Sequence, residues 1–175
     1  TELAKYEYDS SRVEIVPTTE EVSCDESPVM EIQKKKDSSM VVGLRLVKEG
    51  KAQAFISAGN TGAVLSGGVF IVGRIKGIDR PAMAPMLPAY KKRLMLIDAG
   101  ANTNCKPLNL VQFAQMATIY LKNTFGIENP KVGLLNIGTE ETKGNDLVKD
   151  TYNLLKENIL GQDEKIIKNL FDDFC

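Results

Sequence analysis

A chain of 175 residues is long enough to bury one hydrophobic core. Its composition, 43% hydrophobic and 26% charged, excludes an intrinsically disordered chain, and its net charge of −1 gives no overall preference for nucleic acid. No apolar run reaches the ~18 residues that a membrane span needs. The sequence contains no histidine, which excludes Ser–His–Asp and Cys–His catalysis and histidine-ligated metal sites within this chain. Its three irregularly spaced cysteines favour a reducing, cytoplasmic compartment.

The first part of the chain predicts one strand and two helices. Residues 13–16 (VEIV) predict a short strand. Pro28 suits the first turn of a helix that continues to residue 36. Ser38 or Ser39 caps a second helix, and Gly50 is well placed to end it.

Residues 54–73 (AFISAGNTGAVLSGGVFIVG) are the stretch around which we expect the chain to be organised. A short apolar run leads into a polar turn and then into a long apolar segment with helical spacing, which predicts a strand, a tight loop and a helix. The first N–H groups of such a helix lack partners and carry the positive end of its dipole, so phosphate is a natural occupant. A plain connection between a strand and a helix fits the same pattern.

The middle of the chain begins with three closely spaced cations, Arg74, Lys76 and Arg80. Prolines then allow a short or edge strand over residues 82–87. Residues 94–97 (LMLI) predict a strand that ends in the polar loop 98–102.

The last third of the chain predicts further helices around one strand. Apolar residues at helical spacing predict a helix over residues 107–125, with Gly126 as its stop. Residues 131–137 (KVGLLNI) predict a strand that passes into the glycine-rich loop 138–145. Two more helices are predicted over residues 146–158 and 162–175.

The alternation of strands and helices predicts an α/β fold with a mostly parallel sheet covered by helices on both faces. In such folds ligands gather at the carboxyl ends of the strands. We therefore expect three polar loops to line one rim, namely residues 57–62, 98–102 and 138–145.

The chemistry of these loops points to an oxyanion. Neither the dinucleotide fingerprint nor the P-loop pattern is present in the sequence. Lys143, in a glycine-rich turn, offers a compact positive charge to an oxyanion, although a solvated turn residue is the simpler interpretation. Glu140 and Glu141 suit either Mg²⁺ or the start of a helix. Cys105 has no histidine to activate it as a nucleophile.

Four long strings together resemble the bacterial phosphate acyltransferase family, PlsX, of phospholipid synthesis: SSMVVGLRLVKEGKAQAFISAGNTGA, FIVGRIKGIDRPAMAPMLP, DAGANTNCKP and VGLLNIGTEETKGN. The resemblance implies a three-layer α/β/α sandwich, similar to phosphate acetyltransferases and isocitrate-dehydrogenase-like proteins, in a homodimer. It implies acyl transfer from acyl carrier protein to inorganic phosphate, which gives acyl phosphate. Members are longer than this sequence, so we expect residues 1–175 to be a single α/β domain that is an incomplete portion of a longer chain.

Phosphate is largely ionised near pH 7 and has little need of a general base, which fits a chain without histidine. Because the resemblance implies a phosphate acyltransferase, we assign the catalytic roles to Lys143 and Asn145. The substrate-binding residues are Ser57, Gly59, Asn60, Thr61, Gly62, Asp98, Asn102, Gly138 and Thr139. Asp98 and Asn102 order the rim, and a structural role for Asp98 remains open. Three basic clusters suit contact with acidic acyl carrier protein, namely Lys34–Lys36, Arg74/Lys76/Arg80 and Lys91–Arg93, and we favour Arg74, Lys76 and Arg80 because they lie near the central stretch. We expect no cofactor and no metal.

Two alternatives remain. The chain is a non-catalytic folded fragment that binds phosphate or a protein partner, or it catalyses phosphate acetyltransferase-type transfer from acyl coenzyme A.

Overall fold

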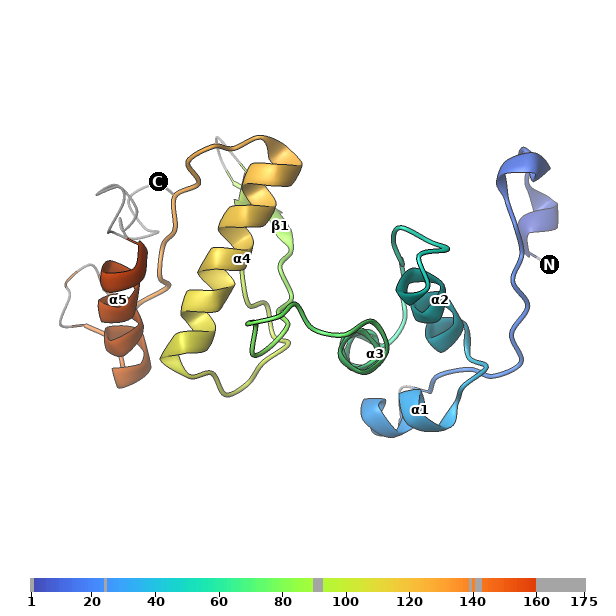
Figure 1. Cartoon of the computed structure of the whole chain (residues 1–175), viewed down its shortest axis with the longest axis horizontal. Helices are drawn as coiled ribbons and strands as arrows, with labels where there is room; N and C mark the ends of the chain where they lie inside the picture. Colours follow the sequence, from blue (N-terminus) through green and yellow to red (C-terminus); the bar gives the residue numbers. More distant parts are fainter. Residues whose placement is uncertain (1, 24, 90–92, 139, 141–142, 160–175) are drawn as a thin grey trace. The chain divides into compact units, whose positions relative to one another are not determined.

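The computed structural model describes residues 2–159 except 24, 90–92, 139 and 141–142. The chain divides into two compact units, Thr1–Gly73 and Arg74–Cys175 (Figure 1). The helix expected over residues 162–175 lies outside the described residues.

The first unit is built from helices. They are η1 (Glu2–Lys5), η2 (Ser10–Arg12), α1 (Pro28–Lys34), α2 (Ser39–Lys48), α3 (Thr61–Gly67) and η3 (Gly68–Val72). The predicted helices α1 and α2 are confirmed, with Pro28 in the first turn of α1 and the Ser38 hydroxyl accepting a hydrogen bond from the N–H of Val41 at the start of α2. The helix predicted after the polar turn is also confirmed, and it continues from α3 into a π-helical turn, η3.

Helices α1, α2 and α3 share one apolar core. Its buried side chains are Ile32, Met40, Val41, Leu44 and Ala63, and Phe55 packs against them. Gly67 lies so close to the side chain of Leu44 that any larger residue would collide with it. Each large aliphatic side chain buried in this way contributes about 1.5–3 kcal/mol to folding, so this core helps to hold the three helices together.

Two strands predicted for the first unit do not form. Residues 13–16 and 54–56 belong to no sheet. A strand requires a hydrogen-bonding neighbour, and the bridge recorded in this unit outside helices and named strands joins Glu20 to Ser38. Ile56 is 94% exposed, as expected for an apolar segment that pairs with no described residue.

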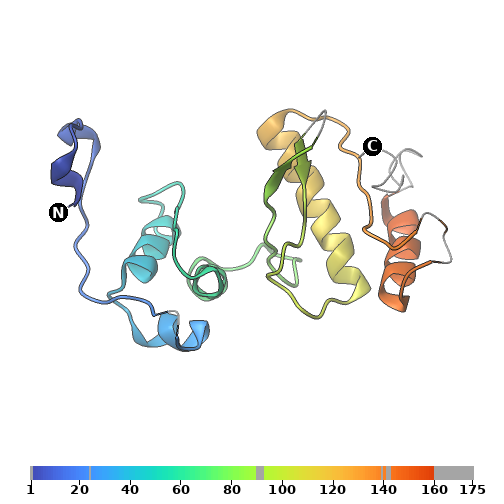
Figure 2. The ribbon, with the colours of Figure 1, turned by 180° about the vertical axis from the view of Figure 1, so that it is seen from behind.

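The second unit contains a β-hairpin and two helices, β1 (Met86–Pro88), β2 (Arg93–Met95), α4 (Pro107–Phe125) and α5 (Asp146–Ile159). Figure 2 shows the two strands as adjacent arrows, and they pair antiparallel with Leu87 opposite Leu94. Two backbone hydrogen bonds beyond the strand ends, from Leu96 to Pro85 and from Ala99 to Met83, extend this pairing. The edge strand predicted over residues 82–87 is thus found at Met86–Pro88, and the strand predicted over residues 94–97 is found at Arg93–Met95, so each is shorter than predicted and shifted toward the turn between them.

Helix α4 packs against α5 through Val111, Ala114 and Leu155, all of them buried. The helix was predicted with the bounds it has, and it ends where Gly126 adopts the left-handed conformation (φ +67°) that favours glycine. Residues 131–137 run beside this core through Val132 but form no strand, and Ile137 is 86% exposed.

The α/β class is confirmed, with helices and a small antiparallel sheet. The expected parallel sheet is not formed by the residues that the structure describes. Among these residues no helix combines the length and the apolar character that crossing a bilayer requires.

Candidate functional site

The loop at residues 57–62 uses its polar side chains to shape its own backbone. The Asn60 side chain accepts a hydrogen bond from the N–H of Ala63 (3.1 Å) and so caps α3. The Ser57 hydroxyl accepts one from the N–H of Gly59 (3.1 Å). Gly62 lies against Pro28 of α1, where a larger residue would crowd the proline ring. The predicted residues Ser57, Gly59 and Thr61 are exposed on this capped turn, so the loop has a defined shape and an open face.

The loop at residues 98–102 is tied to the hairpin by carboxylate hydrogen bonds. One Asp98 oxygen accepts from the N–H of Met83 (2.7 Å), and the other accepts from the N–H of Asn102 (2.7 Å). The Asn102 side-chain amide donates to the carbonyl of Pro81 (2.9 Å). The structure therefore brings the two predicted residues Asp98 and Asn102 together, and both hold backbone in place.

The loop at residues 138–145 is arranged in the opposite way. The backbone of Lys143 is held on both sides: its N–H donates to the carbonyl of Glu140 (3.0 Å), and its carbonyl accepts from the Asn136 side chain (3.1 Å). The side chain of Lys143 is exposed, and it takes part in none of the ion pairs recorded between described residues. Lys143 thus combines a hydrogen-bonded backbone with an exposed side chain.

Two neighbours of Lys143 explain this geometry. The Asn145 side chain accepts from the N–H of Val148 (3.0 Å) and caps the start of α5. Gly144 has φ +95° and lies against the Asn136 side chain, so it meets both requirements of a glycine-only position. The predicted Gly138 lies next to the Lys143 stem, whereas Thr139 is outside the described residues.

A basic turn, defined as residues 74–80, opens the second unit. The N–H of Ile78 donates to the carbonyl of Ile75 (3.0 Å), and Gly77 has φ +90°, as the third position of a type II turn requires. Arg80 donates from its guanidinium to the carbonyl of Asn104 (2.8 Å). The predicted partner-binding residues Arg74 and Lys76 are exposed, and Arg80 is half-buried.

Sequence reasoning missed two buried amides that hold this turn, Asn109 and Gln112 of α4. The Gln112 side chain binds the N–H of Asp79 (3.0 Å) and the carbonyl of Gly77 (2.9 Å). The Asn109 side chain donates to the Asp79 carboxylate (2.9 Å). The available signal was two amides three positions apart on the apolar stripe of a helix, where a polar side chain needs a partner.

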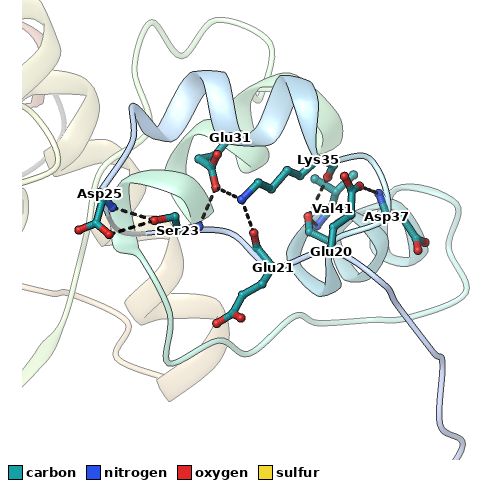
Figure 3. A network of polar contacts seen from close by, with 9 residues as sticks. Glu20, Glu21, Ser23, Asp25, Glu31, Lys35, Asp37 and Val41 are labelled. Atoms are coloured by element: carbon teal, nitrogen blue, oxygen red, sulfur yellow. Dashed lines mark hydrogen bonds and ion pairs between the residues drawn. The ribbon is translucent and has the colours of Figure 1, made fainter.

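Glu31 of α1 is a buried charge of the first unit, with a side chain that is 0% exposed (Figure 3). One of its carboxylate oxygens accepts from the Lys35 ammonium (2.9 Å) and from the N–H of Ser23 (2.6 Å), while the other has no hydrogen-bond partner among the described residues. These two donors, Lys35 first, hold the pKa of Glu31 below its usual range, and the same pair raises the pKa of Lys35. Lys35 also donates to the carbonyl of Glu21 (2.6 Å), so the pair joins the preceding segment to α1.

The three predicted loops are not all in one unit. Residues 57–62 belong to the first unit, and residues 98–102 and 138–145 belong to the second, so their convergence on one rim stays a prediction. No group of three metal-ligating side chains occurs in the part of the chain that the structure describes.

A family model described as "Fatty acid synthesis protein" matches residues 1–165 of this chain. The chain is 58% identical over 157 residues to a phosphate acyltransferase of Clostridioides difficile (strain 630), covering 89% of this chain and 46% of that protein. It is 59% identical over 148 residues to a phosphate acyltransferase of Caldicellulosiruptor saccharolyticus, covering 85% of this chain and 44% of that protein. A phosphate acyltransferase of Clostridium kluyveri is 57% identical over 156 residues, or 89% of this chain and 47% of the relative.

The chain thus spans about half the length of the curated relatives it matches. The resemblance read from the sequence motifs is confirmed, and the relatives carry the name of an acyltransferase. The chain belongs to the fatty acid synthesis protein family.

Proposed function

We propose that the protein transfers an acyl group from acyl carrier protein to inorganic phosphate, giving acyl phosphate for phosphatidic acid and phospholipid synthesis. The observation that carries this proposal is the identity of 52–59% with proteins named phosphate acyltransferase, over most of this chain. We place the reaction in the cytoplasm and assign it to a homodimer. The whole protein would complete the three-layer α/β/α sandwich, whose parallel sheet needs partners for residues 54–56 and 131–137.

The reaction needs placement more than acid–base chemistry. A phosphate oxygen attacks the thioester carbonyl carbon, the carbon–sulfur bond breaks, and the thiolate of the carrier leaves and takes up a proton. Because phosphate is already an anion near pH 7, a histidine base is unnecessary. A cation must instead offset the repulsion between phosphate and the negative charge that develops on the carbonyl oxygen.

Lys143 is the residue that we assign to this cation. Its backbone is held on both sides, by Glu140 and Asn136, while its side chain is exposed in a glycine-rich loop. Asn145 supports the loop by capping α5. This arrangement supports the assignment, because a cation on a fixed backbone loses less freedom when it binds an anion.

The remaining polar residues complete the proposed site. The open face of the capped turn at residues 57–62 would supply hydroxyl and backbone N–H donors to phosphate, and Gly138 and Thr139 would border Lys143. Asp98 and Asn102 would order the rim, as their backbone hydrogen bonds support. The acidic carrier would contact Arg74, Lys76 and Arg80.

The test is an assay of the chain with inorganic phosphate and long-chain acyl carrier protein, run beside acetyl coenzyme A. Formation of acyl phosphate from the carrier supports the proposal. Preference for acetyl coenzyme A would replace it with phosphate acetyltransferase-type transfer. Phosphate binding without turnover from either donor would leave a non-catalytic fragment.

A further inference from the structure

We propose that Asn109 and Gln112 act as positioning residues that hold the basic turn, residues 74–80, as a preformed docking surface for an acidic protein. This inference rests on the proposed function for the identity of that protein, the acyl carrier. The two amides lie on α4 and the turn lies before the hairpin, so the contact joins segments that are distant in the sequence.

Hydrogen bonds from side chains of α4 hold both the backbone of the turn and the side chain of Asp79. Gln112 accepts from the N–H of Asp79 (3.0 Å) and donates to the carbonyl of Gly77 (2.9 Å), so it fixes the backbone on either side of residue 78. Asn109 donates to the Asp79 carboxylate (2.9 Å). Asn109 is 1% exposed and Gln112 is 9% exposed, so breaking these bonds would leave buried amides unpaired, which is costly.

Asn109 also links the turn to the start of α4. Its side-chain oxygen accepts from the N–H of Lys106 (2.8 Å), which is the capping contact at the first turn of the helix. The same side chain therefore caps α4 with its oxygen and holds Asp79 with its nitrogen. Movement of the turn away from α4 would disturb the cap as well.

The surface that results has one apolar side chain between two cations. Ile75 is 71% exposed, and its neighbours Arg74 and Lys76 are exposed as well. Arg74 donates to the carbonyl of Asp79, which keeps its guanidinium on the turn. An exposed apolar anchor with charged neighbours is typical of interface surfaces, in which the apolar group supplies affinity and the charges select the partner.

Two features favour an acidic partner. The turn carries three cations, Arg74, Lys76 and Arg80, against the single carboxylate of Asp79. That carboxylate accepts a hydrogen bond from Asn109, and because the three cations outnumber it the net charge of the turn is positive. A turn that is already fixed loses little conformational entropy on binding, and loosening it should weaken binding without any change in charge.

The decisive comparison is between Asp79→Asn and Asp79→Ala, measured as the dissociation constant for acyl carrier protein by fluorescence anisotropy at two salt concentrations. Both variants remove the same negative charge, but only Asp79→Asn keeps an oxygen that can accept from Asn109. We expect Asp79→Asn to bind at least as tightly as the wild type and Asp79→Ala to bind about two- to tenfold more weakly than Asp79→Asn. Equal dissociation constants for the two variants would overturn the proposal.

A second pair of variants tests Gln112 with a matched control on the same helix. Gln112→Leu removes both backbone ties, whereas Gln115→Leu replaces an exposed amide three positions further on. With helical content checked by circular dichroism, we expect Gln112→Leu alone to weaken carrier binding by about two- to tenfold. Unchanged binding in a folded Gln112→Leu protein would contradict the assignment.

Failure of this inference is distinguishable from failure of the proposed function. If carrier binding depends on residue 79 as described but no acyl phosphate forms, the proposed activity is wrong and the proposed docking surface is supported. If acyl phosphate forms but the two Asp79 variants bind the carrier equally well, the proposed activity is supported and the proposed docking surface is wrong. A wild-type chain that does not bind the carrier would also overturn the docking surface.

Discussion

The loops at residues 98–102 and 138–145 both follow apolar segments of the second unit and both carry polar side chains, yet they use them differently. In the first loop, the side chains of Asp98 and Asn102 form hydrogen bonds with backbone groups of the loop and of the segment that leads into the hairpin. In the second loop, the Asn136 side chain donates to the carbonyl of Lys143, and the Lys143 side chain itself stays exposed. The comparison makes Lys143, whose side chain is exposed, a stronger candidate for direct contact with a reacting group than Asp98, whose carboxylate is already used to hold backbone.

The largest effect should come from removing the exposed cation. Lys143→Met should lower acyl phosphate formation by about 100-fold or more, because it removes the charge that offsets two anions in the transition state. Its thermal midpoint should stay near that of the wild type, since its side chain makes no recorded ion pair with the described residues. Lys122→Met, which replaces an exposed lysine on α4, is the matched control for loss of charge. Similar rates for the two variants would remove Lys143 from the site.

The opposite pattern is expected at Asp98. Asp98→Ala leaves the N–H groups of Met83 and Asn102 without their partner, so we expect a loss of about 2–4 kcal/mol in the free energy of unfolding. Urea denaturation of the purified chain measures this loss. A fully stable Asp98→Ala protein with impaired turnover would show that the carboxylate acts in chemistry rather than in holding the hairpin.

These contrasts also show where sequence reasoning succeeds. The predicted helix over residues 107–125 was found with the same bounds, because helical periodicity, Pro107 at the start and Gly126 at the stop are local signals. The apolar runs at residues 54–56 and 131–137 were assigned as strands, but strand formation depends on a neighbour that no local pattern reveals. Ile56 and Ile137 in these two segments are exposed, as expected for apolar residues that have no strand beside them among the described residues.

The site was predictable to a similar degree. The sequence located the glycine-rich loop of Lys143 and the capped turn of Asn60, since both depend on residues close together in the chain. It did not reveal that Gln112 holds Gly77 and Asp79, because these contacts span more than 30 positions and depend on how α4 packs. Whether the three loops meet at one rim stays a prediction for the same reason.

A smaller effect is expected at the capped turn of the first unit, which extends the comparison to a third loop. Asn60→Ala removes the cap of α3 and should cost about 0.5–2 kcal/mol of stability. Asn60→Asp keeps an oxygen that accepts from the N–H of Ala63, so it should restore most of that loss. The thermal midpoints of both variants, measured by circular dichroism, check this order. Equal midpoints for the two would show that the cap adds little.

The smallest effect is a pH dependence in the first unit, where Glu31 is buried beside Lys35. Because the pKa of Glu31 is lowered in the folded chain, its contribution to stability is complete above the unfolded-state pKa of about 4.3 and is lost as the pH falls through the lower folded-state pKa. Wild-type unfolding midpoints should therefore fall in acid more steeply than those of Glu31→Gln. Parallel pH profiles would contradict a stabilising role for the ionised pair.

The most direct test of the central claim is the dissociation constant of inorganic phosphate, measured by isothermal titration calorimetry on the wild type, Lys143→Met and Lys122→Met. If Lys143 holds phosphate, Lys143→Met should bind it at least about tenfold more weakly, and Lys122→Met should match the wild type. Equal phosphate affinity in all three proteins would contradict the account.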